Sequence, residues 1–107
     1  MGYRIFEIEQ TEPFRRWLKD LRDQNAYTRI RMQIGRLQHG QFGDVRPVGE
    51  GVSEVRMHFG PGYRIYFYRR GEKIIMLLAG GDKSSQATDI RQAITLKKEI
   101  ERSRDER

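Results

Sequence analysis

The sequence predicts an α+β domain, in which an antiparallel-dominated sheet of four to five strands has an N-terminal helical hairpin on one face and also carries a C-terminal helix. Residues 52–79 contain three strand-like segments joined by two glycine-containing turns. Residues 12–38 contain two segments with apolar side chains at helical spacing, and a third such segment follows Ser84-Ser85. A chain of 107 residues has the length of a single domain, residues 1–107, with a modest core.

The three central strands are expected at Val52–Phe59, Tyr63–Arg69 and Lys73–Ala79. Gly60-Pro61-Gly62 suits a tight turn, because proline presets φ and glycine accepts a positive φ; Arg70-Gly71-Glu72 is a second hairpin signal. Side chains alternate along a strand, so the first two strands have one apolar face and one polar face. The polar face should carry Glu54, Arg56, His58, Arg64 and Tyr66, with Lys83 arriving from the end of the third strand.

The N-terminal residues are expected to form a strand followed by a helix. Tyr3–Ile8 is rich in apolar side chains and is expected to be the first strand. Thr11 is a suitable N-cap, and Pro13 lies in the first turn, where proline costs little. The apolar stripe of this helix runs from Phe14 to Leu21 at helical spacing.

A second helix is expected from Ala26 to about Gln38, with Asn25 as its N-cap. Two adjacent helices with a short link form a hairpin that must cover an apolar surface, and the apolar face of the sheet is the obvious one. Asp44–Val48 is expected to be a short edge strand, limited by Pro47.

The last helix is expected to begin at Ser84-Ser85, which offers an N-cap, and its apolar stripe runs from Ala87 to Ile100. The remaining residues, 101–107, contain no apolar side chain. We therefore expect this tail to fray.

Composition limits the classes of function. The chain has no cysteine, which excludes disulfides, thiolate metal ligands and a cysteine nucleophile, and we expect no metal and no cofactor. A net charge of +6 favours phosphate-rich partners, although an acidic protein would also fit. The first residues are charged where a signal peptide needs an apolar run, and no segment reaches transmembrane length. We therefore expect a cytoplasmic protein without membrane contact.

The residues of the polar face suit the cleavage of RNA. This reaction removes a proton from the 2′-hydroxyl, stabilises a pentacoordinate phosphate and returns a proton to the 5′-oxygen. Arginine cannot act as a base at ordinary pH, so Arg56 and Arg64 are expected to hold the phosphate. His58 is the natural proton donor or acceptor. The other candidates are Glu54 as an alternative base or an RNA contact, Lys83 for a phosphate contact or proton transfer, and Tyr66 for stacking on an RNA base.

Each of these residues also has a simpler interpretation. Arginine and tyrosine on an open strand are common solvated residues, and Glu54 opposite cations can form a surface ion pair. His39, at the end of a helix, is expected to interact with the helix dipole and to have no functional role. The combination of cations, a histidine and a tyrosine on one face is what favours a functional site.

At these residues the sequence resembles the RelE/ParE toxin superfamily, and in particular the HigB-like group known as addiction module killer proteins. The resemblance covers nearly the whole chain. It includes the opening strand, the early helix and three motifs, which are Gly51–Arg56 (GVSEVR), Gly62–Phe67 (GYRIYF) and Leu77–Gln86 (LLAGGDKSSQ). The last motif is the most specific to the killer-protein group.

The resemblance implies a type II toxin that cleaves mRNA, often on the ribosome, and that is neutralised by a cognate antitoxin with a helix-turn-helix. Operator DNA would then be contacted only through the antitoxin complex. Arg64 matches the strand arginine that RelE-like toxins use on the scissile phosphate, and Arg56 and Lys83 fall at or near basic positions. His58 has an approximate counterpart only.

The chain departs from RelE-type enzymes in one respect, because they place a tyrosine in the C-terminal segment and this chain has none after Tyr68. Either His58, Glu54 or Lys83 then handles the protons, or the protein does not cut RNA. Two alternatives follow: a ParE-like toxin that inhibits DNA gyrase, or an inactive protein that only binds an antitoxin. For a nuclease, we expect Arg64→Ala to abolish toxicity and to leave folding nearly intact.

Overall fold

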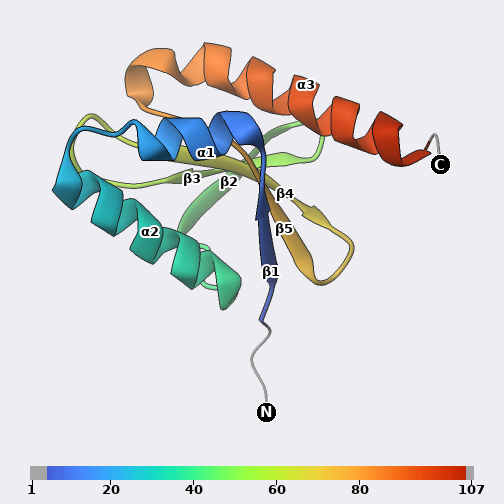
Figure 1. The fold of residues 1–107 in the computed structure, drawn as a ribbon, viewed down its shortest axis with the longest axis horizontal. Coiled ribbons are helices and arrows are strands. Elements are labelled where there is room, and N and C mark those ends of the chain that lie inside the picture. Colours follow the sequence, from blue (N-terminus) through green and yellow to red (C-terminus); the bar gives the residue numbers. More distant parts are fainter. Residues whose placement is uncertain (1–4, 106–107) are drawn as a thin grey trace.

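The computed structural model describes residues 5–105 (Figure 1). The elements follow the predicted α+β order, and the fold class is confirmed. They are β1 (Glu7–Gln10), α1 (Glu12–Lys19), α2 (Gln24–Gln38), β2 (Asp44–Gly49), β3 (Val52–Arg56), β4 (Arg64–Arg70), β5 (Ile74–Gly81), a 3₁₀ turn (Lys83–Ser85) and α3 (Gln86–Asp105).

The five strands form one sheet in the order β1-β5-β4-β3-β2. Neighbouring strands are antiparallel except β1, which pairs with β5 in parallel. Arg64 lies opposite Arg56 on β3 and opposite Gly81 on β5. This register brings the ends of three strands together, and β5 leads from there into Lys83.

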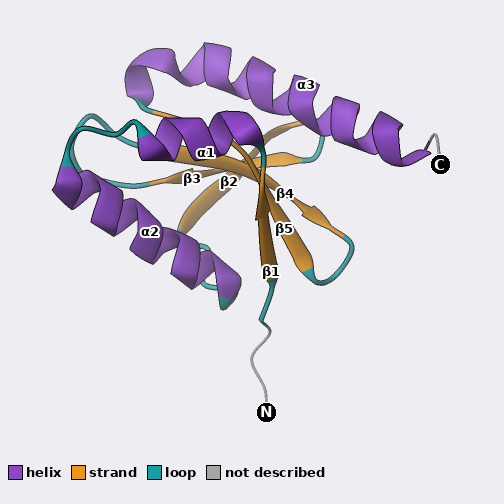
Figure 2. Cartoon of the chain, viewed as in Figure 1, coloured by secondary structure: helices purple, strands orange, loops and turns teal. Residues whose placement is uncertain are grey.

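Helices cover both faces of the sheet (Figure 2). On one face, Phe14 of α1 and Ile30 and Leu37 of α2 pack against Ile65 and neighbouring side chains of the sheet, as predicted for the helical hairpin. On the other face, α3 packs against Tyr66, Tyr68 and other side chains. The polar face that the sequence predicts to be open therefore lies largely beneath α3.

Several strand boundaries differ from the prediction. The first strand begins at Glu7, whereas Tyr3 and Arg4 of the predicted strand lie outside the described residues. Strand β3 ends at Arg56 because the chain turns away towards Gly60, although the Met57 N–H still donates to the Tyr63 carbonyl at 2.9 Å.

The predicted cap of the second helix is wrong, and the segment expected to cap the last helix forms a 3₁₀ turn with an aspartate cap of its own. Asp23, not Asn25, caps α2, and its Oδ1 accepts the Asn25 N–H at 2.9 Å. Asp82 caps the turn that leads into α3, and its Oδ1 accepts the Ser84 N–H at 2.8 Å. A carboxylate is a stronger acceptor than the amide or hydroxyl a few residues later.

Residues 101–105 continue α3, and the prediction that the end of the chain frays stays a prediction. Ile100 packs against the core on this face, and Lys97 donates to Glu101 at 3.0 Å one turn later. Glu106 and Arg107 lie outside the described residues. Over the part of the chain that is described, no helix is both long and apolar enough to span a bilayer.

Candidate active site

Four basic side chains predicted from the sequence meet in one open pocket of about 360 Å³, between the end of β3, the start of β4 and the turn after β5. We call it the basic pocket. Its walls also include the Met57–Gly60 segment, Gly62 and Tyr63. The four basic residues are Arg56, His58, Arg64 and Lys83.

Lys83 reaches this pocket because its backbone is tied to the turn between β3 and β4. Its N–H donates to the Pro61 carbonyl at 3.3 Å. Gly62 has a φ of 80°, as predicted for the turn, and a Cβ there would lie 3.5 Å from the Lys83 Cβ. The positive φ is what favours glycine here, since a Cβ would only be in ordinary contact with Lys83.

Arg64 is 6% exposed and is held from two sides. Its Nη1 donates to the Gly62 carbonyl at 2.8 Å. Its Nε lies 3.3 Å from Glu54 Oε2 in a buried ion pair. This arrangement fixes the guanidinium at the wall of the basic pocket, where a phosphate can approach its remaining N–H groups.

Glu54 is a fully buried carboxylate with four polar neighbours, and we call this cluster the Glu54 network. One oxygen accepts from Arg46 Nε at 3.1 Å. The other accepts from the Tyr66 hydroxyl at 3.1 Å and from Gln86 Nε2 at 2.8 Å, beside the Arg64 pair. Burial, and then the Glu54 charge, raise the pKa of Tyr66 well above its usual range, so its hydroxyl stays protonated and donates.

The Glu54 network corrects two expectations. Glu54 and Tyr66 are both fully buried, so neither offers a surface on which RNA could lie. Removing Arg64 would leave the buried Glu54 carboxylate without one of its positively charged partners, which destabilises the fold. The expectation that Arg64→Ala leaves folding nearly intact therefore does not hold. Exposed members of the basic pocket are therefore better positions for testing activity.

His58 has a carboxylate partner that the sequence did not reveal. Its side chain is 67% exposed, and its Nε2 lies 2.7 Å from Asp44 Oδ2 on β2. The same oxygen lies 3.9 Å from Arg56 Nε. An ionised carboxylate only accepts, so in this contact the His58 Nε2 carries the proton that is donated to Asp44. The β2–β3 register, in which Asp44 faces Arg56, was the missing signal.

The Gly80-Gly81 pair is explained by packing. A Cβ on Gly80 would overlap the Trp17 ring, and a Cβ on Gly81 would overlap the Asp89 carboxylate. Asp89 accepts from the Ser85 hydroxyl at 2.5 Å, and burial raises the pKa of Asp89 although this bond opposes the shift. These glycines thus let α1 and α3 approach the end of β5 closely.

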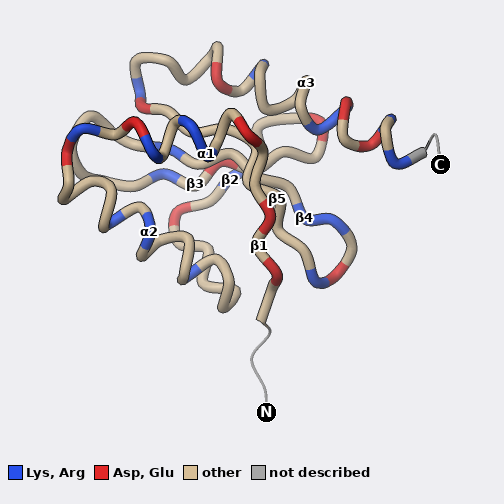
Figure 3. Tube along the Cα trace, in the orientation of Figure 1, with Lys and Arg blue, Asp and Glu red and all other residues tan. Residues whose placement is uncertain are grey.

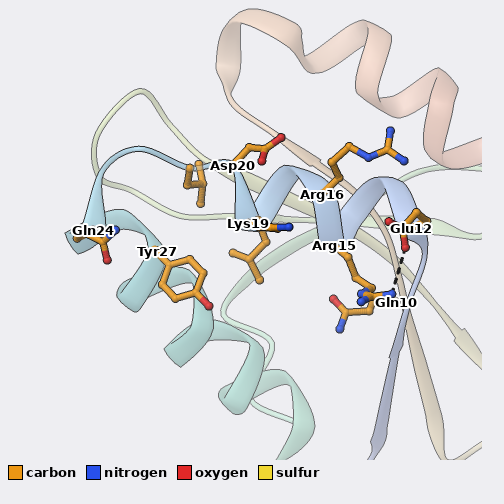
Figure 4. A pocket seen from close by; sticks show the side chains of 10 residues that line it. Gln10, Glu12, Arg15, Arg16, Lys19, Asp20, Gln24 and Tyr27 are labelled. Atoms are coloured by element: carbon orange, nitrogen blue, oxygen red, sulfur yellow. Dashed lines mark hydrogen bonds and ion pairs between the residues drawn. The ribbon is translucent and has the colours of Figure 1, made fainter.

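A wider hollow of about 780 Å³ lies between α1 and the start of α2 (Figure 4). Its polar walls include Arg15, Arg16 and Lys19, and Arg15 pairs with Glu12 at 3.1 Å. It contains none of the predicted site residues. Figure 3 likewise shows Lys and Arg spread over α1, α2, α3 and the β4–β5 hairpin, so positive charge alone does not locate a site.

Residues 5–105 contain no group of three or more histidine, aspartate or glutamate side chains that could hold a metal ion.

His39 caps the C-terminus of α2, where its Nδ1 lies 3.1 Å from the Gly35 carbonyl oxygen.

Two solved structures share the architecture of this chain. The E. coli toxin RelE, an arginine double mutant in the free state, gives a TM-score of 0.65 at 12% identity, covering 89% of this chain and 97% of RelE. A chain of the RelBE2 toxin-antitoxin complex from Mycobacterium tuberculosis gives 0.63 at 16% identity, covering 78% of this chain and 97% of that one. The fold is therefore RelE-like, as predicted.

The sequence matches a family model over residues 16–101, described as Phage derived protein Gp49-like (DUF891). The chain belongs to this Gp49-like family. A curated protein of Haemophilus influenzae, described only as uncharacterized, is 42% identical over 94 residues, covering 88% of this chain and 95% of that protein. The RelE-like fold agrees with the predicted relation to RelE, whereas membership of the RelE/ParE superfamily and of its HigB-like subgroup stays a prediction.

Proposed function

We propose that this protein is the toxin of a type II toxin-antitoxin pair and a metal-independent endoribonuclease that cuts mRNA. The observation that carries the proposal is the basic pocket, where two arginines, a histidine and a lysine from different elements line one open hollow. RNA supplies the phosphate that such a pocket attracts. The RelE-like fold and the Gp49-like family support the toxin class.

In the proposed reaction the Nδ1 of His58 takes the proton of the 2′-hydroxyl, while Asp44 holds the opposite nitrogen. The 2′-oxygen attacks phosphorus, and the bond from phosphorus to the 5′-oxygen breaks. Arg64 and Arg56 stabilise the charge on the pentacoordinate phosphate. Lys83 holds a phosphate oxygen or supplies the proton that the 5′-oxygen gains, so the products are a 2′,3′-cyclic phosphate and a 5′-hydroxyl.

The Glu54 network has a positioning role in this proposal. Its carboxylate pairs with Arg64 Nε inside the protein, while Arg64 also lines the basic pocket. Gln86 of α3 donates to the same carboxylate, which links the start of α3 to the arginine.

The proposed partners are a cognate antitoxin with a helix-turn-helix, mRNA and the ribosome, with operator DNA contacted only through the antitoxin complex. An acidic antitoxin would be attracted by the net charge of +6 and would neutralise the toxin by covering the basic pocket. The solved M. tuberculosis relative was determined as a toxin-antitoxin complex, which supports this assignment.

The test is a nucleotide-resolution map of mRNA cuts after brief induction of the wild type, His58→Ala and Lys83→Ala. Both side chains are exposed, so their loss should leave the fold intact. A proton-transfer group is worth about 10²–10⁴ in rate, so we expect cuts within reading frames that fall by that factor in His58→Ala. Intact mRNA with arrested growth would indicate a gyrase inhibitor, and intact mRNA with normal growth would indicate an inactive antitoxin-binding protein.

A further inference from the structure

A second hollow adjoins the basic pocket on the side of α2. It has a volume of about 320 Å³ and shares Arg56, Met57, His58 and Phe59 with the basic pocket. The two hollows therefore adjoin at His58 and its neighbours, and we call the pair of hollows the groove. The remaining walls of the second hollow are Asp44 and one side of α2, and we call it the α2 hollow. The α2 side chains in its wall are Arg29, Met32, Gln33 and Arg36.

The spacing of the α2 residues explains this wall. Positions 29, 32, 33 and 36 recur every three or four residues, so their side chains lie on one side of the helix. Arg31 lies on a different side, where its Nη1 donates to the Tyr27 hydroxyl at 3.1 Å. Two of the arginines of α2 thus belong to the groove and a third, on the same helix, does not.

Arg29 and Phe59 form a stacked pair within the α2 hollow. The Arg29 guanidinium carbon lies 3.9 Å from the centre of the Phe59 ring. Phe59 in turn packs against Tyr63, with ring centroids 5.4 Å apart, and this contact helps to hold the Phe59 ring in place. Arg29 is exposed and lines the α2 hollow, and RNA bases stack on guanidinium planes.

The chemistry of the α2 hollow favours RNA over a protein partner. Arg29, Arg36 and Arg56 supply three cations, and Met32, which is 54% exposed, supplies an apolar edge. Single-stranded RNA is bound by this combination of a basic groove and flat stacking surfaces. An RNA chain with one phosphate in the basic pocket extends beyond this pocket. The α2 hollow adjoins the basic pocket, so it is the place where the next nucleotide could bind.

We propose that the α2 hollow is the subsite for the nucleotide next to the scissile phosphate, with its base stacked on Arg29 and its phosphate held by Arg36. The proposal rests on the proposed nuclease function. It assigns to α2 a part in choosing where the RNA is cut.

The experiment maps mRNA cuts in cells for the wild type, Arg29→Ala, Arg29→Lys and Arg36→Ala, with Arg31→Ala as the matched control at equal expression. Arg31→Ala removes the same charge from the same helix outside the groove. Thermal unfolding of each purified variant verifies that these exposed substitutions leave the fold intact.

We expect cutting by Arg29→Ala to fall about tenfold, with an altered base preference at one position beside the cut. Arg29→Lys keeps the positive charge but lacks the planar guanidinium on which a base stacks, so it should show the same altered base preference. Arg36→Ala should slow cutting at all sites alike, because a phosphate contact carries no sequence information. Arg31→Ala should match the wild type.

If Arg29→Ala and Arg31→Ala cut at the same rate and with the same preference, the inference is wrong and the proposed function survives. Absence of cuts by the wild type would overturn the proposed function and this inference with it. If Arg29→Ala changed only the neutralisation by the antitoxin, a protein would occupy the α2 hollow, and the inference would again be wrong.

Discussion

The face of the sheet beneath α1 and α2 and the face beneath α3 differ in what they bury. The first face packs apolar side chains such as Ile65 and Phe67 against the two helices. The second face combines apolar packing with the Glu54 network. Both exclude water, but only the second contains a carboxylate that holds an arginine of the basic pocket. The first face provides stability, and the second couples stability to the site.

The largest losses of stability should appear when a central side chain of either face is truncated. Glu54→Ala leaves the buried Arg64 guanidinium without the carboxylate that pairs with it and should lower the free energy of unfolding by about 3–5 kcal/mol. Ile65→Ala on the other face should cost about 2–5 kcal/mol through the cavity it creates. Urea unfolding measures both.

Activity should separate these two variants even where their stabilities agree. At a temperature at which both remain folded, Glu54→Ala should have lost RNA cutting because Arg64 is no longer held, whereas Ile65→Ala should retain it. Equal activity in the two variants would show that the Glu54 network serves stability alone.

Two tyrosines on the α3 face offer a finer comparison. The Tyr66 hydroxyl donates to Glu54, so Tyr66→Phe should cost about 1.5–3 kcal/mol. The Tyr68 hydroxyl is buried and has no hydrogen-bond partner within the part of the chain described, so Tyr68→Phe should be neutral or slightly stabilising. Thermal unfolding of the pair tests this. A larger loss in Tyr68→Phe would contradict the hydrogen-bond assignment.

The cap before α3 should have a smaller effect that depends on pH. Asp82→Ala should cost about 1 kcal/mol at neutral pH. The Ser84 hydrogen bond lowers the pKa of Asp82 below its ordinary value of 3.8. Its carboxylate therefore stabilises the fold fully above pH 3.8, and this contribution is lost as the pH falls through the lower pKa of the folded state.

The measurement for this cap is the midpoint of urea unfolding between pH 2 and 7, with Asp82→Asn as the control that cannot titrate. The wild type should lose its advantage over Asp82→Asn only at acidic pH. An advantage that persisted unchanged at pH 2 would show that Asp82 does not act as an ionised cap.

The smallest effect should come from the surface pair of Arg15 and Glu12 on α1. Both side chains are largely exposed, so Arg15→Ala should change the free energy of unfolding by less than about 0.5 kcal/mol. Loss of growth inhibition in this variant, with its stability unchanged, would show that the hollow between α1 and α2 has a function of its own.

The same contrast explains how far the sequence could be interpreted. Apolar periodicity located the helical hairpin and the strands, because packing on the α1–α2 face follows directly from spacing. The turn at Pro61-Gly62 predicted that Arg64 lies across from the His58–Arg56 region, and the register pairs Arg64 with Arg56. Alternation of side chains could not show that α3 covers Glu54 and Tyr66, since a polar stripe has the same pattern whether it is solvated or buried in a network.

Asp44 and the α2 hollow could not be found from the sequence for a related reason. Asp44 meets His58 only through the β2–β3 register, and that strand pair contains an irregularity between Pro47 and Gly49. Arg29 meets Phe59 only because α2 packs across the sheet beside the β3–β4 turn. Contacts between distant segments depend on tertiary packing, which local patterns do not specify.

The most direct test of the central claim is the chemistry of the RNA ends that the protein produces. Reaction through the 2′-hydroxyl, with His58 and the basic pocket in the roles proposed, yields a 5′-hydroxyl and a 2′,3′-cyclic phosphate. Ligation-based sequencing that separates 5′-hydroxyl from 5′-phosphate ends distinguishes the possibilities in wild-type and His58→Ala cells. We expect new 5′-hydroxyl ends that are lost in His58→Ala. New ends that carry 5′-phosphate, or ends unchanged by the substitution, would contradict the account.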